Sequence, residues 1–277
     1  MDHATDVLDT ISDRRAEGRP FALATVVRTV AATAAKAGAK AVILPDGTIS
    51  EGWIGGDCAR AAVLRAAREA LADGRPRLGS VQPPDALQEQ GIPAGEERAG
   101  VRFAQNMCPS EGTMDVFVEP VLPLPEIVIC GSSPVAIAVA DLGRRIGFAV
   151  TVCVPAAEQA SFAAADRRIE GYALPVEQAG LRFVVIATQG RGDEAALRAA
   201  LAVEADYVAF VGSRKKAQAL KAKLAESGIA PERLARLKAP AGLDLGAITP
   251  DEIAISILAE IVAARRRGQP REPPSRS

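Results

Sequence analysis

The chain has 277 residues, of which 48% are hydrophobic, and its net charge at pH 7 is -1. A chain of this length can bury a large core and is near the size at which one core divides into two, so we expect two domains. The balanced charge provides no positive field to gather phosphate backbones, which argues against nucleic acid as a partner. No apolar run reaches the roughly 20 residues that span a bilayer, so we expect a cytoplasmic protein without a membrane span.

The first part of the chain, 1–122, predicts an α+β domain. After a helix around 6–17, two strands are indicated by the runs FALATVVRTV and AKAVILPDGT, because Ala, Val and Thr suit a pleated, half-buried surface. A glycine turn and a helix are then predicted by GWIGGDC and CARAAVLRAAREALADG. We interpret SVQPPDALQEQGIPAGEERAG, rich in Pro, Gly and charge, as a surface loop, and VRFAQNMCPSEGTMDVFVEPV as a hairpin that closes the domain.

The second part, 123–268, alternates strand and helix. Strands are indicated by EIVICG, FAVTVCV, RFVVIAT and YVAFVG, and each is followed by a helical or loop segment. This rhythm predicts a Rossmann-like, doubly wound parallel sheet, so the fold class is α/β. The last helix has Thr249 as its N-cap, Pro250 at its first position and Glu252 in a capping box. We interpret 269–277 as a disordered tail.

A candidate phosphate turn, Gly131-Ser132-Ser133, joins the first strand of this sheet to its helix. In dinucleotide folds such a turn brings backbone N–H groups and a helix N-terminus to a pyrophosphate. Only Gly131 remains of a G-x-G-x-x-G pattern, and Val154-Pro155 stands where an acid would hold the ribose. NAD(P) binding is therefore disfavoured, while another phosphorylated ligand, or none, stays open.

A second candidate turn, Gly212-Ser213-Arg214-Lys215, also follows a strand and begins a helix, and Lys216 comes next. Cations at a helix N-terminus oppose the macrodipole, which indicates that they are kept for an anion. The alternative is that these side chains extend into solvent or pair with nearby carboxylates.

The number and spacing of the histidines and cysteines limit which catalytic mechanisms and metal sites the chain can have. The only histidine is His3, so mechanisms that need an imidazole base are nearly excluded. The four cysteines show none of the close spacings of zinc or redox motifs. Two of them, Cys130 and Cys153, fall in β-runs, and we interpret both as buried small hydrophobic residues.

The other two cysteines are candidates for function. Gly55 and Gly56 precede Cys58 at the start of the alanine-rich helix. A thiol near a helix N-terminus has a lowered pKa and is a better nucleophile and soft-metal ligand. Cys108, in a turn containing Pro, Ser and Gly, is the candidate for a second thiol of the same domain.

The first domain contains ALATVVRT, then GAK, a DG turn and IGG-x-C, and the second contains YVAFVGSRKKAQAL and APAGLDLGAITPDEIAISILAEIVAARRRG. Together these segments resemble the XdhC/CoxI family. The resemblance runs from 21 to 268. It implies a factor that binds molybdenum cofactor, as molybdopterin or its dinucleotide form, promotes its sulfuration with a cysteine desulfurase and passes it to a molybdenum hydroxylase apoenzyme of xanthine or carbon monoxide dehydrogenase type.

The resemblance also implies roles for particular residues. Cys58 matches the glycine-loop cysteine of the family and Cys108 its second cysteine, which makes both candidate metal ligands. Arg28, Lys40 and 212–215 match family positions and are expected to contact the cofactor. The protein is then a cofactor chaperone with no catalytic residue of its own, and a homodimer is expected.

The chain departs from the family pattern at several places. They are Ala34-Ala35 in place of Pro-Arg, Asp57 in place of a third glycine, Arg60 in place of a glutamate, 131–134 in place of Gly-x-Gly-His and 189–192 in place of an acidic-histidine segment. These differences indicate a divergent branch. Two alternatives therefore stay open, namely an NAD(P)-binding oxidoreductase and a scaffold for hydroxylase maturation that binds no ligand.

Overall fold

The computed structural model describes residues 7–31, 33–107, 112–174 and 180–266, so the tail predicted at 269–277 lies outside the described residues. The chain divides into two compact units, Met1–Pro123 and Leu124–Ser277. Among the described residues, no helix is long and apolar enough to cross a membrane.

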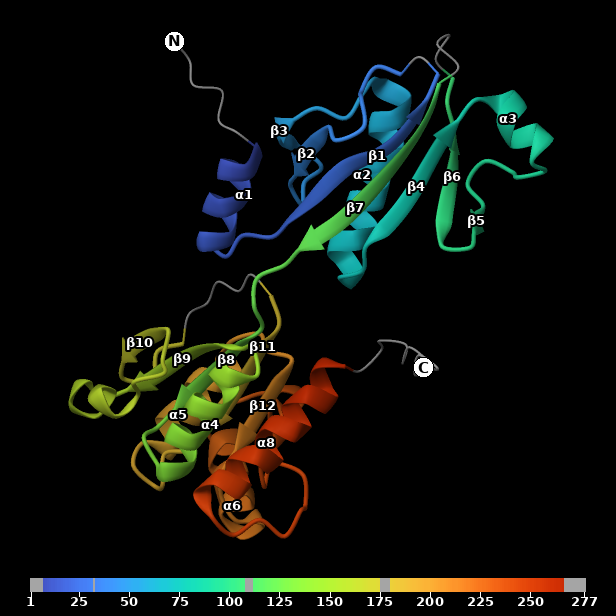
Figure 1. Cartoon of the computed structure of the whole chain (residues 1–277). Coiled ribbons are helices and arrows are strands. Elements are labelled where there is room, and N and C mark those ends of the chain that lie inside the picture. The colour runs from blue at the N-terminus through green and yellow to red at the C-terminus, as the bar shows by residue number, and fades with distance from the viewer. Residues whose placement is uncertain (1–6, 32, 108–111, 175–179, 267–277) are drawn as a thin grey trace. The chain divides into compact units, whose positions relative to one another are not determined.

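The N-terminal unit is a seven-stranded mixed sheet of order β3-β2-β1-β7-β4-β6-β5. Its elements are α1 (Val7–Ala16), β1 (Phe21–Val30), β2 (Lys40–Ile43), β3 (Ile49–Gly52), α2 (Asp57–Asp73), β4 (Arg77–Gln82), α3 (Pro84–Glu89), β5 (Glu97–Arg98), β6 (Val101–Gln105) and β7 (Thr113–Val121). Helix α2 lies along one face of the sheet beside β1, β7 and β4 (Figure 1). Alternate residues of β1, Ala22, Ala24 and Val26, share a buried core with Val63 and Ala67 of α2.

Two predictions for this unit are wrong. The segment 80–100, interpreted as a surface loop, contains the end of β4, all of α3 and β5. β4 pairs parallel with β6 and antiparallel with β7, so the two strands predicted to form a hairpin are separated by β4. Pro83 and Pro84 begin helix α3 instead of a loop, since a proline in the first turn of a helix lacks only an N–H that would have no partner there.

The C-terminal unit is a six-stranded sheet of order β10-β9-β8-β11-β12-β13, in which every neighbouring pair is parallel. Its elements are β8 (Glu126–Cys130), α4 (Pro134–Arg145), β9 (Ala149–Val154), the 3-10 helix η1 (Ala156–Ser161), β10 (Arg167–Glu170), β11 (Arg182–Ile186), α5 (Asp193–Ala202), β12 (Tyr207–Phe210), α6 (Arg214–Glu226), α7 (Pro231–Ala235), β13 (Leu237–Lys238) and α8 (Pro250–Arg265). In chain order the strands run 3-2-1-4-5-6, the order of a dinucleotide-type Rossmann fold. The predicted Rossmann-like architecture is confirmed.

Both faces of this parallel sheet are covered, which explains its continuous apolar strands. Ile127 and Ile129 of β8 belong to a core that includes residues of α4 and α8. Val128 and Cys130, pointing to the other face, share a second core with residues of α5 and α6. Helix α4 lies in front of the sheet in Figure 1, with α8 beside it.

Helix α8 begins as predicted. The Oγ1 of Thr249 accepts a hydrogen bond from the backbone N–H of Glu252, and the Glu252 carboxylate accepts one from the N–H of Thr249 at 2.9 Å. Pro250 occupies the first helical position. The capping box fixes where the last helix starts on the sheet.

Candidate functional site

The glycine loop of the N-terminal unit leads directly into α2. Gly56 is the N-cap of the helix and, having no side chain, provides no capping acceptor, and Cys58 is the second helical residue. The first N–H groups of a helix have no partner within the helix and carry its positive dipole end. The backbone of Cys58 therefore lies in the first turn of α2, at this positive end.

A small hollow of about 60 Å³ lies beside this loop. Gly55 and Gly56 line it together with Asn106 and Gly112, which stand on either side of the segment that carries Cys108. The amide nitrogen of Asn106 donates a hydrogen bond to the carbonyl oxygen of Gly112 at 2.7 Å and so ties the two ends of that segment together. Cys108 itself lies outside the described residues, but both ends of its segment are held at the glycine loop.

The same hollow is lined by Ala34 and Ala35, where the sequence departs from the family pattern. Their small side chains occupy the place of a proline and an arginine. Near the loop, this chain therefore has neither the rigid ring nor the positive charge that the family pattern puts there.

The two basic residues of the N-terminal unit that were expected to contact the cofactor, Arg28 and Lys40, are not among the described residues that line the hollow. Arg28 lies at an irregularity in β1, and its Nε donates to the Oδ2 of Asp115 at 2.6 Å. The other oxygen of Asp115 accepts a hydrogen bond from Ser80 at 2.6 Å. Lys40, at the start of β2, donates from Nζ to the hydroxyl of Thr25 at 3.0 Å. Both side chains thus have partners within the sheet.

The turn Gly131-Ser132-Ser133 of the C-terminal unit is shaped by close backbone contacts. Gly131 has φ +104°, and a Cβ at this position would come within 2.6 Å of the carbonyl oxygen of Ala187. The Ser133 hydroxyl accepts a hydrogen bond from the N–H of Ala136 and caps α4. Only glycine fits here, because the backbone just after β11 lies too close for a side chain. This requirement holds whether or not the turn binds a ligand.

A carboxylate that the sequence analysis missed faces this turn. Ser132 donates a hydrogen bond to Glu158 of η1, beyond the end of β9. The sequence showed Val154-Pro155 at the strand end and no acid there. Glu158 follows four residues later, and no strand or helix periodicity indicated that the 3-10 helix would return it to the turn.

The second predicted turn is occupied by internal contacts. Ser213 caps α6 by accepting from the N–H of Lys216 at 3.2 Å. Lys216 pairs with the carboxylate of Asp193 at 2.5 Å and lies over the ring of Phe210. Arg214 and Lys215 are exposed. The sequence analysis left open that these cations pair with a carboxylate or extend into solvent. Lys216 does the first, and Arg214 and Lys215 are exposed to solvent.

Asp193, at the start of α5, was also missed. Its side chain is nearly buried and accepts hydrogen bonds from the Thr188 hydroxyl and from the N–H of Gly190. Burial alone would raise the pKa of this carboxyl, but the bonds from Lys216, Thr188 and Gly190 outweigh it and hold the pKa below its ordinary value. A charged aspartate, paired with Lys216, thus lies at the carboxyl edge of the sheet.

Cys130 and Cys153 lie opposite each other on β8 and β9 and are fully buried. The hydrogen bond with Cys153, together with burial, raises the pKa of the Cys130 thiol. The prediction that both are buried small residues is confirmed. Within the described ranges, no group of three or more His, Cys, Asp or Glu side chains could hold a metal ion.

Comparison with known proteins places both units in one family. Residues 127–261 match the XdhC Rossmann domain, and residues 14–82 match the XdhC and CoxI family. The match to residues 14–82 includes the glycine loop and all of α2, and the match to residues 127–261 includes nearly the whole parallel sheet.

Individual relatives extend over much of the chain. "Uncharacterized protein YqeB" of Escherichia coli K12 is 31% identical over 254 residues, which are 89% of this chain and 44% of that protein. A Bacillus subtilis 168 protein, named as a probable subunit of xanthine dehydrogenase, is 26% identical over 166 residues, 56% of this chain and 47% of that protein. The chain spans less than half the length of either relative.

A solved structure described as a xanthine dehydrogenase from Bacillus halodurans is also similar, with a TM-score of 0.46 and 19% identity, over 96% of this chain and 98% of that one. The two family matches fall on the two units in the same order as the glycine loop and the Rossmann sheet. The chain belongs to the XdhC and CoxI family.

Proposed function

We propose that this protein is a maturation factor for a molybdenum hydroxylase of xanthine or carbon monoxide dehydrogenase type, and that it binds molybdenum cofactor at the glycine loop before α2. One observation carries the location: the hollow that joins Gly55 and Gly56 to both ends of the Cys108 segment. Family membership and the Bacillus subtilis relative, which is named for xanthine dehydrogenase, support the class of client.

The chemistry of the loop suits the cofactor. Thiolates are soft ligands for a metal such as molybdenum and can carry sulfur, and a helix N-terminus accommodates a phosphate. Cys58 and Cys108 are the residues that would hold the metal. A hollow of about 60 Å³ admits only a small end of a pterin, since one water takes about 30 Å³ of liquid. The bulk of the cofactor would therefore lie outside it. When bound, the cofactor would bring the molybdenum centre that a cysteine desulfurase sulfurates.

The test is anaerobic titration of the full chain with molybdenum cofactor, followed by gel filtration and measurement of retained pterin. We expect retention by the wild type and by Cys153→Ala, a control that removes a buried thiol of the other unit, and weaker retention, which needs a higher cofactor concentration for saturation, in Cys58→Ser and Cys108→Ser. No retention by the wild type, under conditions where a known binder retains pterin, would contradict the proposal. Capture of the hydroxylase apoenzyme without pterin would then support the scaffold alternative.

A second candidate function is nucleotide binding by the C-terminal unit, and it rests on Glu158. This carboxylate stands beside Ser132 at the turn after the first strand, near the place where dinucleotide folds use an acid for the ribose. The unit would then take the dinucleotide form of the cofactor, or NAD(P) as an oxidoreductase does. Titration with NADH, followed by its fluorescence, separates these ligands: binding that disappears in Glu158→Ala supports NAD(P), and no binding argues against it.

A further inference from the structure

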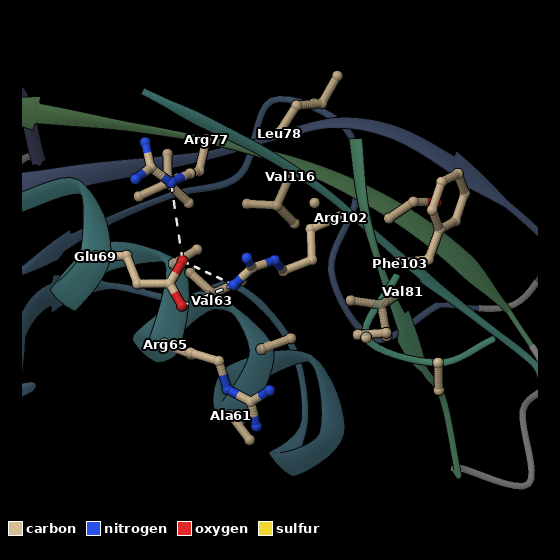
Figure 2. Close-up of a pocket in the computed structure, with 18 of the residues that line it drawn as sticks. Ala61, Val63, Arg65, Glu69, Arg77, Leu78, Val81, Arg102, Phe103 and Val116 are labelled. Carbon is tan, nitrogen blue, oxygen red and sulfur yellow. Dashed lines mark hydrogen bonds and ion pairs between the residues drawn. The ribbon is translucent and has the colours of Figure 1, made fainter. Parts of the chain in front are cut away.

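A pocket separate from the glycine loop lies beneath the middle of α2. Its volume is about 370 Å³, and it opens between the helix and strands β4 and β6 (Figure 2). Among the described residues that line it are neither Gly55 nor Gly56 of the glycine loop, nor the buried Cys130 and Cys153. It is a neighbour of the small hollow, because Val81 lines both.

Small residues on both α2 and β4 leave this space between the helix and the sheet. Gly79 of β4 lies opposite Arg102 and Val116 in the sheet, on the face that looks toward α2. A Cβ at Gly79 would lie 3.8 Å from the nearest atom, a carbonyl oxygen, so a side chain there has room. On the helix side, Ala62 and Ala66 line the same space.

The interior of the pocket is mainly apolar. Val63 projects from α2, Val81 from β4, and Val116 and Val118 from β7, and all four are nearly inaccessible to solvent. A space of a few hundred Å³ with apolar walls and a few polar groups is typical of sites for small organic ligands.

Positive charge surrounds this interior. Nη1 of Arg102 donates to both carboxylate oxygens of Glu69, at 2.7 and 2.8 Å, and Arg77 lies 3.8 Å from the same carboxylate. Figure 2 shows Glu69 between these two guanidinium groups, with Arg65 projecting from the helix nearby. Arg65 is exposed and has no ion-pair partner among the residues that the structure describes. Three arginines thus line the pocket with one carboxylate, while Asp73 and Glu97, outside the lining, pair with Arg77 and Arg102 as well.

One polar atom of the pocket lacks a partner. The Nε of Arg102 is buried and has no hydrogen-bond acceptor in the described part of the chain, although the side chain as a whole is 39% exposed. A buried donor without an acceptor destabilises a protein, because its hydrogen bond to water has been lost and not replaced. An oxygen supplied by a ligand would satisfy this donor, and a charged oxygen would also interact favourably with the Arg65 side chain, which has no carboxylate partner among the described residues.

We propose that this pocket binds a small organic anion with an apolar, flat body and a carboxylate or phosphate group. The body would lie between α2 and β4, and the anionic group would accept a hydrogen bond from Arg102 beside Arg65. The site goes beyond the proposed function, because the described residues that line it do not include Gly55 and Gly56 of the glycine loop.

The test uses two probes on the full chain, 1-naphthyl phosphate and the neutral 1-naphthol, with binding measured by equilibrium dialysis. We expect the phosphate to bind at least about tenfold more tightly, a difference of about 1.4 kcal/mol. Gly79→Val should reduce the affinity for both probes by about tenfold or more, since valine suits a strand and fills the pocket. Ala66→Leu, which fills the space from the helix, is the second filling variant.

Charge is tested separately from volume. Arg102→Gln should weaken binding of the phosphate by about tenfold and leave 1-naphthol unchanged. Arg98→Gln is the matched control, because Arg98 pairs with Glu96 outside the pocket and its loss should change neither probe. Circular dichroism melting curves establish that each variant is folded.

Equal affinity of the wild type for the two probes, or unchanged binding in both folded filling variants, would overturn the proposal. Pterin retention by Gly79→Val, measured in parallel, distinguishes this site from the glycine loop. We expect that retention to persist.

Discussion

The two units differ in how they use the polar groups near their candidate sites. In the Rossmann unit these groups have partners within the protein: Ser132 bonds to Glu158, and Lys216 pairs with Asp193. In the N-terminal unit the Nε of Arg102 is buried without an acceptor among the described residues, and the N-cap Gly56 offers no side chain to its helix. A fold that is typical of nucleotide binding therefore does not identify the ligand site by itself. The hydrogen-bonding groups without partners are the reason why we propose ligand sites in the N-terminal unit.

The largest expected effect comes from comparing two glycines. Gly131→Ala should lower the free energy of unfolding by about 3 kcal/mol, because φ is +104° and the new methyl would meet the backbone of Ala187. Gly56→Ala should lower it by less than about 1 kcal/mol, because φ is -74° and nothing lies within 4 Å. Urea unfolding measures both. Equal effects would show that the glycine loop, too, is fixed by packing.

A smaller effect is expected at Glu260 of the Rossmann unit. Burial alone would raise the pKa of this carboxyl, but hydrogen bonds from Lys238, from Tyr207 and from the N–H of Gly242 outweigh it and lower the pKa. A lowered folded pKa contributes stability that is present above the unfolded pKa and is lost as the pH falls from about 4.3 through the folded value. Glu260→Gln should therefore lose about 2 kcal/mol at pH 7.

The pH dependence provides the control for that variant. Wild-type unfolding by urea at a series of pH values should show a steeper loss of stability in acid than Glu260→Gln shows. Identical slopes for the two proteins would mean that Glu260 is not held in its charged form by these contacts.

The smallest expected effects distinguish basic residues of the two units. Lys216→Ala should destabilise by about 1.5 kcal/mol, because it leaves the nearly buried Asp193 without its cation. Arg28→Ala should cost no more than about 0.5 kcal/mol, because the Arg28 side chain is 60% exposed in its pair with Asp115. Thermal melts of both variants test this order. A larger loss of stability in Arg28→Ala than in Lys216→Ala would indicate that the ion pair of Arg28 stabilises the fold and that Arg28 is not available to bind a ligand.

Much of the fold follows from the sequence. The alternation of buried strands and helices after 123 predicted the parallel sheet, and Thr249 and Glu252 marked the start of α8 through local capping chemistry. Strand β4 was missed because Gly79, Ser80 and Gln82 break the apolar pattern, although Ser80 and Gln82 are buried and Ser80 donates a hydrogen bond to Asp115 of β7. Burial of polar residues by long-range pairing leaves no periodic signal.

The candidate sites were less predictable, for a related reason. The glycine loop and its cysteine could be read from a local pattern. Glu158 reaches its turn through a 3-10 helix, and the pocket at Gly79 depends on β4 lying between β6 and β7. Each of these features arises from chain segments that meet only in the folded structure.

The most direct test of the central claim is molybdenum X-ray absorption on the anaerobic complex of the full chain with molybdenum cofactor. We predict a sulfur ligand from the protein that is lost in Cys58→Ser and retained in Cys153→Ala. Identical molybdenum spectra for the wild type and Cys58→Ser, at equal cofactor occupancy, would contradict the assignment of the metal to the glycine loop.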